Sequence, residues 1–326
     1  MTSLEPRPLR IWCTDQYNNS PDPVPYLAKM LPPFVLDRDN PELLFYGPFG
    51  KAHRAFDCPR VFITGENARP DFNRADYAIS FDHLEFGDRH IRVPLWVFYL
   101  SAREILAQRQ PYSPADLTGR EFCLSIVSNG RWVDPVRDRF FHALHARRPV
   151  ASMGRHLRND MRLAEREVAG KPGGKLSFKD QFLFSLAFEN SSSPGYVTEK
   201  LFEAFALGTI PIYWGDPLVA RDFNPAAFVN RMDFADDAAC IDYVLELAED
   251  PARQLEMLNA PIYAEPNLPE KYEQKMQDFL NEIIARPAEA RGRRAKYGWM
   301  KTVLAREARR KKGLRGFLLR QLDRDR

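Results

Sequence analysis

The chain alternates short apolar runs with segments of helical spacing, and this alternation limits the folds that it can adopt. Apolar runs typical of strands are found at residues 9–13, 42–47, 60–67, 75–82, 90–100, 121–129, 181–190 and 209–215. Helical spacing is found at residues 136–147 and 197–208, and Gly208 stands where helices commonly stop. Strand and helix units in series predict an α/β protein with parallel sheets.

The length of 326 residues predicts roughly two domains. We place the boundary in a polar stretch with two prolines, which gives a first domain of residues 1–115 and a second of 116–285. Ligands of open parallel sheets bind beyond the carboxyl ends of the strands, so the polar loops after the strands are expected to gather at one edge.

The C-terminal tail, residues 286–326, differs in kind from the rest of the chain. It carries 15 Lys and Arg against 4 Asp and Glu, whereas the remainder has a net charge of −8. Trp299, Met300, Val303 and Leu304 share one helical face, so the tail is predicted to be an amphipathic helix that binds an anionic membrane surface. The alternatives are a helix folded back on the body and, less favoured, a nucleic-acid partner.

The location expected from the chain is cytoplasmic, with the tail on the inner face of the cell membrane. The first residues lack the apolar core of a signal peptide. No stretch reaches the ~18 consecutive apolar residues that a membrane span needs.

The stretch "FENSSSPGYVTEKLFEAFALGTIPIYWGDP" places hydroxyl groups, a carboxylate and an ammonium group at the start of one predicted helix. Small residues allow a ligand to approach the backbone, and the helix N-terminus attracts anions. Lys200 adds a positive charge that suits a diphosphate, and Glu199 can accept hydrogen bonds from sugar hydroxyls. These residues predict a nucleotide-sugar site, while the alternative is a solvated first turn of an ordinary helix.

A second loop supports the same interpretation. Arg137 in "SNGRWVDPVRDRFF" lies in the first turn of a predicted helix, and its guanidinium can donate two parallel hydrogen bonds to phosphate oxygens. The chain has no GxxxxGK[ST] loop, and its "DRD" at 37–39 lies in a polar, proline-flanked stretch with no predicted strand before it. We therefore expect no metal and no cofactor at the site, with helix dipole, Lys and Arg stabilising the diphosphate.

These residues resemble the donor-binding signature of the α1,3-fucosyltransferases, glycosyltransferase family ten. The resemblance continues through "RDFNPAAFVN" (221–230), and upstream through residues 60–96 and "CLSIVSN" (123–129). It covers roughly half of the chain and is weak in the first 40 residues and at 146–175.

The resemblance implies a GT-B architecture, two facing Rossmann-like domains with the active site in the cleft. It implies an inverting transfer of fucose from GDP-β-L-fucose, with Glu66 of "TGEN" as general base and no required metal. Arg137 and Lys200 would neutralise the leaving diphosphate. Glu199 would hold ribose or fucose hydroxyls or offset charge on the sugar, and these roles stay open. The remaining expected donor contacts are Asn190, Tyr196, Ser128 and Asn129.

Several alternatives remain at this stage. Asp82 and Glu85 are rival carboxylates, and His83 and His90 could act as bases by their chemistry. The donor could be another GDP- or UDP-sugar, or the protein could be an inactive glycan- or nucleotide-binding relative. The expected acceptor is a glycan containing GlcNAc or Glc, such as a lipopolysaccharide O-chain. The choice between α1,3 and α1,4 linkage is open, because the loops of the acceptor domain match the family least. No heptad repeat is visible, so coiled-coil dimerisation is not supported and the oligomeric state is open.

Overall fold

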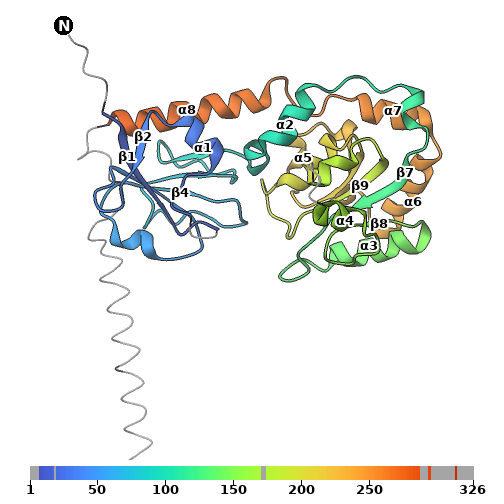
Figure 1. Cartoon of the computed structure of the whole chain (residues 1–326), viewed down its shortest axis with the longest axis horizontal. Coiled ribbons are helices and arrows are strands. Elements are labelled where there is room, and N and C mark those ends of the chain that lie inside the picture. Colours follow the sequence, from blue (N-terminus) through green and yellow to red (C-terminus); the bar gives the residue numbers. More distant parts are fainter. Residues whose placement is uncertain (1–6, 18–19, 170–173, 287–292, 295–312, 314–326) are drawn as a thin grey trace, which may run out of the picture.

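The protein has two lobes, each built on a parallel sheet (Figure 1). A computed structural model describes residues 7–17, 20–169, 174–286, 293–294 and 313. The first sheet has the strand order β2-β1-β3-β4-β5-β6, and the second has the order β11-β10-β9-β7-β8. Every pairing between neighbouring strands is parallel, which confirms the predicted α/β class.

The strands follow the apolar runs of the sequence closely. The first sheet is formed by β1 (Leu9–Thr14), β2 (Phe34–Leu36), β3 (Leu43–Tyr46), β4 (Arg60–Ile63), β5 (Tyr77–Ser80) and β6 (His90–Arg92). The second sheet is formed by β7 (Glu121–Ser125), β8 (Ala151–Ser152), β9 (Phe182–Phe188), β10 (Ile210–Trp214) and β11 (Val229–Asn230). All residues of β3, β4 and β5 are buried, because strands inside a parallel sheet are covered on both faces.

Helices cover the sheets and connect the lobes. They are α1 (Pro25–Met30), α2 (Leu100–Ala107), α3 (Val136–Arg147), α4 (Arg162–Val168), α5 (Glu199–Ala206), α6 (Asp237–Ala248), α7 (Pro251–Asn259) and α8 (Leu268–Ala285). The predicted helix at 197–208 is α5, and Gly208 just after it has a φ of +71°, which glycine adopts without steric cost.

Two sequence-based expectations need correction. The run at 90–100 is a strand only over His90–Arg92, because Pro94 cannot donate to a sheet ladder. The chain then forms a 3-10 turn and enters α2. The second correction concerns α8, which was assigned to the second domain but crosses back onto the first lobe (Figure 1). There Phe279 contacts Tyr77 with ring centroids 6.0 Å apart.

The lobes meet through a buried and charged interface. The guanidinium of Arg92 donates to both carboxylate oxygens of Asp222, at 2.9 and 2.6 Å. The indole of Trp96 is fully buried and packs against Phe202 and Phe223 of the second lobe. The hydrophobic core is therefore continuous across the two lobes, and the relative placement of their loops is set by packing.

The start of the basic tail is bound to the first lobe. The backbone N–H groups of Arg293 and Arg294 both donate to Oδ1 of Asp76 at 2.6 Å, and the Arg294 guanidinium pairs with the same carboxylate. Asp76 is fully buried. The predicted amphipathic face lies outside the described residues. Among the helices of the described part of the chain, none has the length and apolarity to cross a membrane.

Candidate functional site

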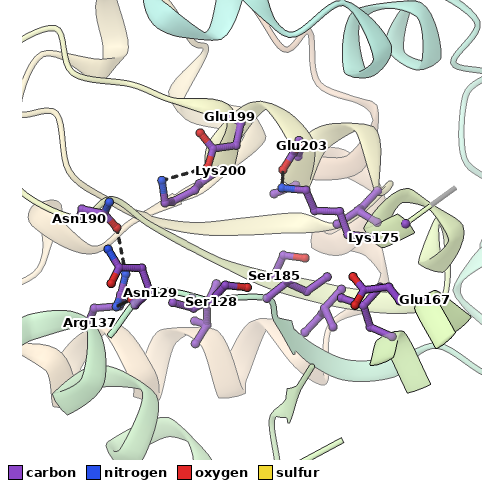
Figure 2. A pocket seen from close by; sticks show the side chains of 18 residues that line it. Ser128, Asn129, Arg137, Glu167, Lys175, Ser185, Asn190, Glu199, Lys200 and Glu203 are labelled. Carbon is purple, nitrogen blue, oxygen red and sulfur yellow. Dashed lines mark hydrogen bonds and ion pairs between the residues drawn. The ribbon is translucent and has the colours of Figure 1, made fainter. Parts of the chain in front are cut away.

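A cavity of about 560 Å³ opens at the carboxyl ends of β7 and β9 in the second lobe. It lies between the loop after β7 and the face of α5 (Figure 2). Six of the residues predicted to bind a donor line it, namely Ser128, Asn129, Arg137, Asn190, Glu199 and Lys200. These residues are up to 72 positions apart in sequence, and they meet because both strands end at the same edge of a parallel sheet.

Arg137 forms one wall of this cavity. Its side chain is only 5% exposed, and it donates to the Asn190 side-chain oxygen at 3.1 Å and to the Asn129 carbonyl at 2.5 Å. The backbone N–H of Asp134 donates to the Asn190 carbonyl, which fixes the loop before α3. Burial lowers the pKa of Arg137, but a guanidinium stays protonated at any physiological pH. The wall therefore presents a fixed cation to the cavity.

The start of α5 forms the opposite wall, and the positive charge of Lys200 there is paired with neighbouring carboxylates. Lys200 Nζ lies 3.2 Å from Glu199 Oε1 and 3.1 Å from Glu189 Oε2, and it also donates to Thr198 Oγ1 at 2.9 Å. Glu189 has no solvent exposure, and its carboxylate also accepts the Thr198 N–H and hydroxyl at 2.7 Å each. Lys200 is therefore held between two carboxylates, of which the sequence pattern marked only Glu199.

Glu199 is ionised in this arrangement. Burial alone would raise its pKa, but the charges of Lys200 and Lys175 outweigh that effect and bring the pKa down to about 2. Its second oxygen accepts a hydrogen bond from Tyr99 of the first lobe at 3.0 Å. Glu199 is thus an anchored acceptor at the boundary between the lobes, able to accept from hydroxyl groups.

The inner part of the cavity is apolar with a polar edge. Leu124, Ile126, Leu163 and Leu207 supply its apolar surface. Lys175 and Glu203 form an ion pair at the edge, as Figure 2 shows. This combination suits a flat ring with polar edges, because pockets for such rings join apolar walls to a few placed polar groups.

Glu66 lies on the first lobe, close to the start of α5. It follows β4, and its neighbour Asn67 donates to Ser191 Oγ at 2.7 Å and to Ser193 Oγ at 3.3 Å in the loop that precedes α5. Partial burial raises the pKa of Glu66; Lys200 opposes that shift and Glu199 adds to it. The predicted base therefore stands within electrostatic range of both charged residues of α5, although they belong to different lobes.

Tyr196 does not line the cavity. Its ring is 2% exposed and packs against Phe81 of the first lobe with centroids 5.2 Å apart. Burial raises its pKa strongly, and Glu189, Glu66 and Glu199 add to the shift. The side chain thus fills the space between the lobes beside the charged cluster.

Of the rival acids and bases, Asp82 and His90 have structural partners. Asp82 pairs with Arg69, and His90 lies 2.9 Å from Ser80 Oγ and 2.8 Å from the Leu84 carbonyl. Burial lowers the pKa of His83 to about 4, with Arg92 adding to the shift, so this ring is neutral near pH 7. Glu85 is exposed.

Among the described residues, no group of three or more His, Cys, Asp or Glu side chains could hold a metal ion. The residues missed by sequence reasoning are Asn67, Tyr99, Glu189, Lys175 and Glu203. Glu189 carried a signal, as a charge placed directly after a seven-residue, largely buried strand, and Asn67 closes the "TGEN" motif that marked Glu66.

Two family models match the chain. The alpha-(1,3)-fucosyltransferase FucT N-terminal domain matches residues 28–99. The C-terminal model of glycosyltransferase family 10 (fucosyltransferase) matches residues 120–261. The matched segments fall in the first and second lobes respectively.

Curated relatives carry the same names. Alpha-(1,3)-fucosyltransferase FucT of Helicobacter pylori is 33% identical over 301 residues, which cover 79% of this chain and 61% of the relative. Alpha-(1,3)-fucosyltransferase B of Drosophila melanogaster is 28% identical over 64% of this chain and 51% of the relative. The chain therefore spans little more than half the length of these relatives.

Solved structures agree with the fold. A crystal structure of an alpha1,3-fucosyltransferase superposes with a TM-score of 0.70 at 30% identity, covering 88% of this chain and 92% of that one. A second, of alpha1,3-fucosyltransferase with GDP-fucose, gives a TM-score of 0.67 at 29% identity, covering 88% and 93%. With the two parallel-sheet lobes, this likeness confirms the predicted GT-B architecture.

Proposed function

Because the chain belongs to the α-1,3-fucosyltransferases of glycosyltransferase family 10, we propose that it transfers L-fucose from GDP-β-L-fucose to a glycan hydroxyl with inversion. The observation that carries this proposal is that the Glu66 loop of the first lobe contacts, through Asn67, the loop before α5, whose Glu199 and Lys200 line the cavity. An inverting transfer needs a base on one face of the sugar and a stabilised leaving group on the other. In this proposal Glu66 on the first lobe supplies the base, and Arg137 with the start of α5 on the second lobe stabilises the leaving group.

The donor nucleotide occupies the cavity of the second lobe in this proposal. The guanine ring lies against its apolar inner surface, and the diphosphate lies between Arg137 and the start of α5. Asn129, Asn190 and Ser128 hydrogen-bond the donor. The arrangement stabilises the leaving diphosphate with fixed cations and backbone dipoles, so the reaction requires no metal.

Glu66 is the general base. Its carboxylate takes the proton of the acceptor hydroxyl while that oxygen attacks C1 of fucose, and the bond from C1 to the β-phosphate oxygen breaks. GDP leaves with the bonding electrons, and the anomeric configuration changes from β to α. The raised pKa of Glu66 brings it closer to the operating pH and makes it a better base than an ordinary carboxylate. Glu199 accepts hydrogen bonds from ribose or fucose hydroxyls or offsets positive charge on the sugar.

The acceptor binds at the first lobe. We propose that the attacking group is O3 of GlcNAc or Glc in an oligosaccharide such as a lipopolysaccharide O-chain. The setting is the cytoplasm, at the inner face of the cell membrane, where the basic tail meets anionic lipid.

A panel of nucleotide sugars tests the proposal. Wild-type protein is incubated with GDP-fucose, GDP-mannose, UDP-galactose and UDP-GlcNAc, together with N-acetyllactosamine, and released nucleotide is measured. We expect turnover with GDP-fucose, and Glu66→Gln should bind GDP normally but transfer about 10²–10⁴-fold more slowly. Preference for a UDP-sugar would refute the fucose assignment. Binding of GDP without transfer to any acceptor would indicate an inactive relative.

A further inference from the structure

Two exposed aromatic rings lie together on the first lobe, where the proposed chemistry does not use them. Tyr17 is 69% exposed and Phe49 is 48% exposed. Their ring centroids are 5.6 Å apart, with 64° between the planes. Two adjacent large rings left in water are an apolar patch, and such patches often mark a binding surface.

The loops that carry these rings are locked together by one buried carboxylate. Asp15 accepts hydrogen bonds from the Ala52 N–H at 3.0 Å and the His53 N–H at 2.9 Å, and it lies 2.6 Å from His53 Nδ1. The Asp15 carbonyl also accepts the Phe49 N–H at 3.0 Å. The backbone that carries the pair is therefore held in place before any ligand arrives, which reduces the entropy lost on binding.

The two loops lie very close together around the Asp15 carboxylate. Asp15 itself has a φ of +55°, a left-handed conformation that costs of order 1 kcal/mol or more in a residue other than glycine. A Cβ on Gly50 would lie 2.2 Å from Asp15 Oδ1, so a larger residue there would displace this hydrogen-bonded carboxylate.

The position of the pair relates it to the proposed base. Tyr17 follows β1, Phe49 follows β3 and Glu66 follows β4, and these three strands are neighbours in one parallel sheet. Their carboxyl ends therefore share the edge on which Glu66 faces the second lobe. Adjacent strands are ~4.8 Å apart, so the loops that carry the rings leave the sheet about one to two strand spacings from the Glu66 loop.

We propose that Tyr17 and Phe49 form a stacking site for a pyranose ring of the acceptor, next to the ring that carries the attacking hydroxyl. This inference rests on the proposed function. The C–H face of a pyranose ring is apolar and packs against an aromatic face, while its hydroxyls stay at the rim in water. The offset from Glu66 matches a neighbouring sugar rather than the reacting one, so the site selects for acceptor length.

The test compares a short and a long acceptor with Tyr17→Ala/Phe49→Ala. With a trimer of N-acetyllactosamine, KM for the acceptor should rise about tenfold, which corresponds to 1.4 kcal/mol. With free GlcNAc, which supplies only the reacting ring, KM should not change, and KM for GDP-fucose should not change with either. Tyr17→Phe and Phe49→Tyr keep the rings and should behave as wild type. Val35→Ala, at an exposed position on the edge strand β2, controls for loss of surface apolar area.

A binding measurement separates this inference from the proposed function. Ligand-observed NMR with the same trimer and GDP, without fucose donor, reports glycan contact even if no transfer occurs. Wild type should bind the trimer, and the double variant should bind about tenfold more weakly. Equal KM and equal binding in wild type and double variant would overturn the inference and would leave a protein partner as the occupant of the rings. Absence of trimer binding by wild type would also overturn it.

Discussion

Breaking the ion pair between the lobes should destabilise the whole protein. The change is Arg92→Met, which keeps the apolar length of the side chain and removes its charge. Arg92 donates to Asp222 twice and to the Phe81 carbonyl at 3.1 Å, and the Asp222 side chain is 2% exposed. After the change, the partners left to the Asp222 carboxylate among the described residues are the Tyr272 hydroxyl at 2.8 Å and the longer Trp96 contact at 3.3 Å.

The expected magnitude follows from this burial. Removing one partner of a buried pair strands the other charge and costs about 3–5 kcal/mol, whereas an exposed pair is worth about 0–1 kcal/mol. The pKa of Arg92 supports a net favourable contact, because hydrogen bonding and charge from Asp222 raise it despite the opposing effect of burial. Arg103→Met is the matched control, since Arg103 pairs with Glu270 and Glu273 nearer the surface.

Denaturant unfolding measures both variants, and a double-mutant cycle with Asp222→Asn isolates the pair. Arg92→Met should lose about 3–5 kcal/mol of unfolding free energy, and Arg103→Met about 1 kcal/mol. The double variant Arg92→Met/Asp222→Asn should cost less than the sum of its parts by roughly 2 kcal/mol. Equal losses for Arg92→Met and Arg103→Met, or simple additivity in the cycle, would refute the reasoning.

Three other predictions concern the site. Arg137→Lys keeps a charge but loses the fork that joins Asn190 and Asn129, so GDP affinity measured by calorimetry should fall roughly 10- to 150-fold; unchanged affinity would remove Arg137 from the donor site. The acid limb of kcat/KM against pH should follow the raised pKa of Glu66, because the base must be ionised and activity is lost as pH falls through that value. Glu199→Gln removes a negative charge that raises the pKa of Glu66, so the acid limb of kcat/KM should move to lower pH when initial rates are measured across pH. A shift of this limb to higher pH would contradict the assignment of Glu66 as the base.

Much of the site follows from sequence, because loops after parallel strands meet at one edge. That rule brings Arg137, Asn190 and Lys200 to one cavity from three separate segments. The rule does not say which side chains from other parts of the chain contact these three residues. Glu189 and Tyr99, which hold the start of α5, became visible only with the packing of side chains.

In the fold, too, some elements can be predicted from the sequence and others cannot. Buried strands such as β3 and β9 are continuous apolar runs and were predicted, while β2 at the edge is a three-residue, partly exposed segment with no such pattern. The return of α8 to the first lobe could not be predicted either. An amphipathic helix shows which face it buries, but its sequence does not say against which sheet.

The stereochemistry of transfer by the wild-type protein tests the central claim most directly. GDP-β-L-fucose and N-acetyllactosamine are incubated with the enzyme, and the anomeric configuration of the new fucosyl bond is read by NMR before any secondary reaction. Base catalysis by Glu66 from the face opposite GDP predicts an α-linked product, formed by wild type and nearly absent with Glu66→Gln. A β-linked product, or an α-linked product formed equally fast by Glu66→Gln, would contradict the account.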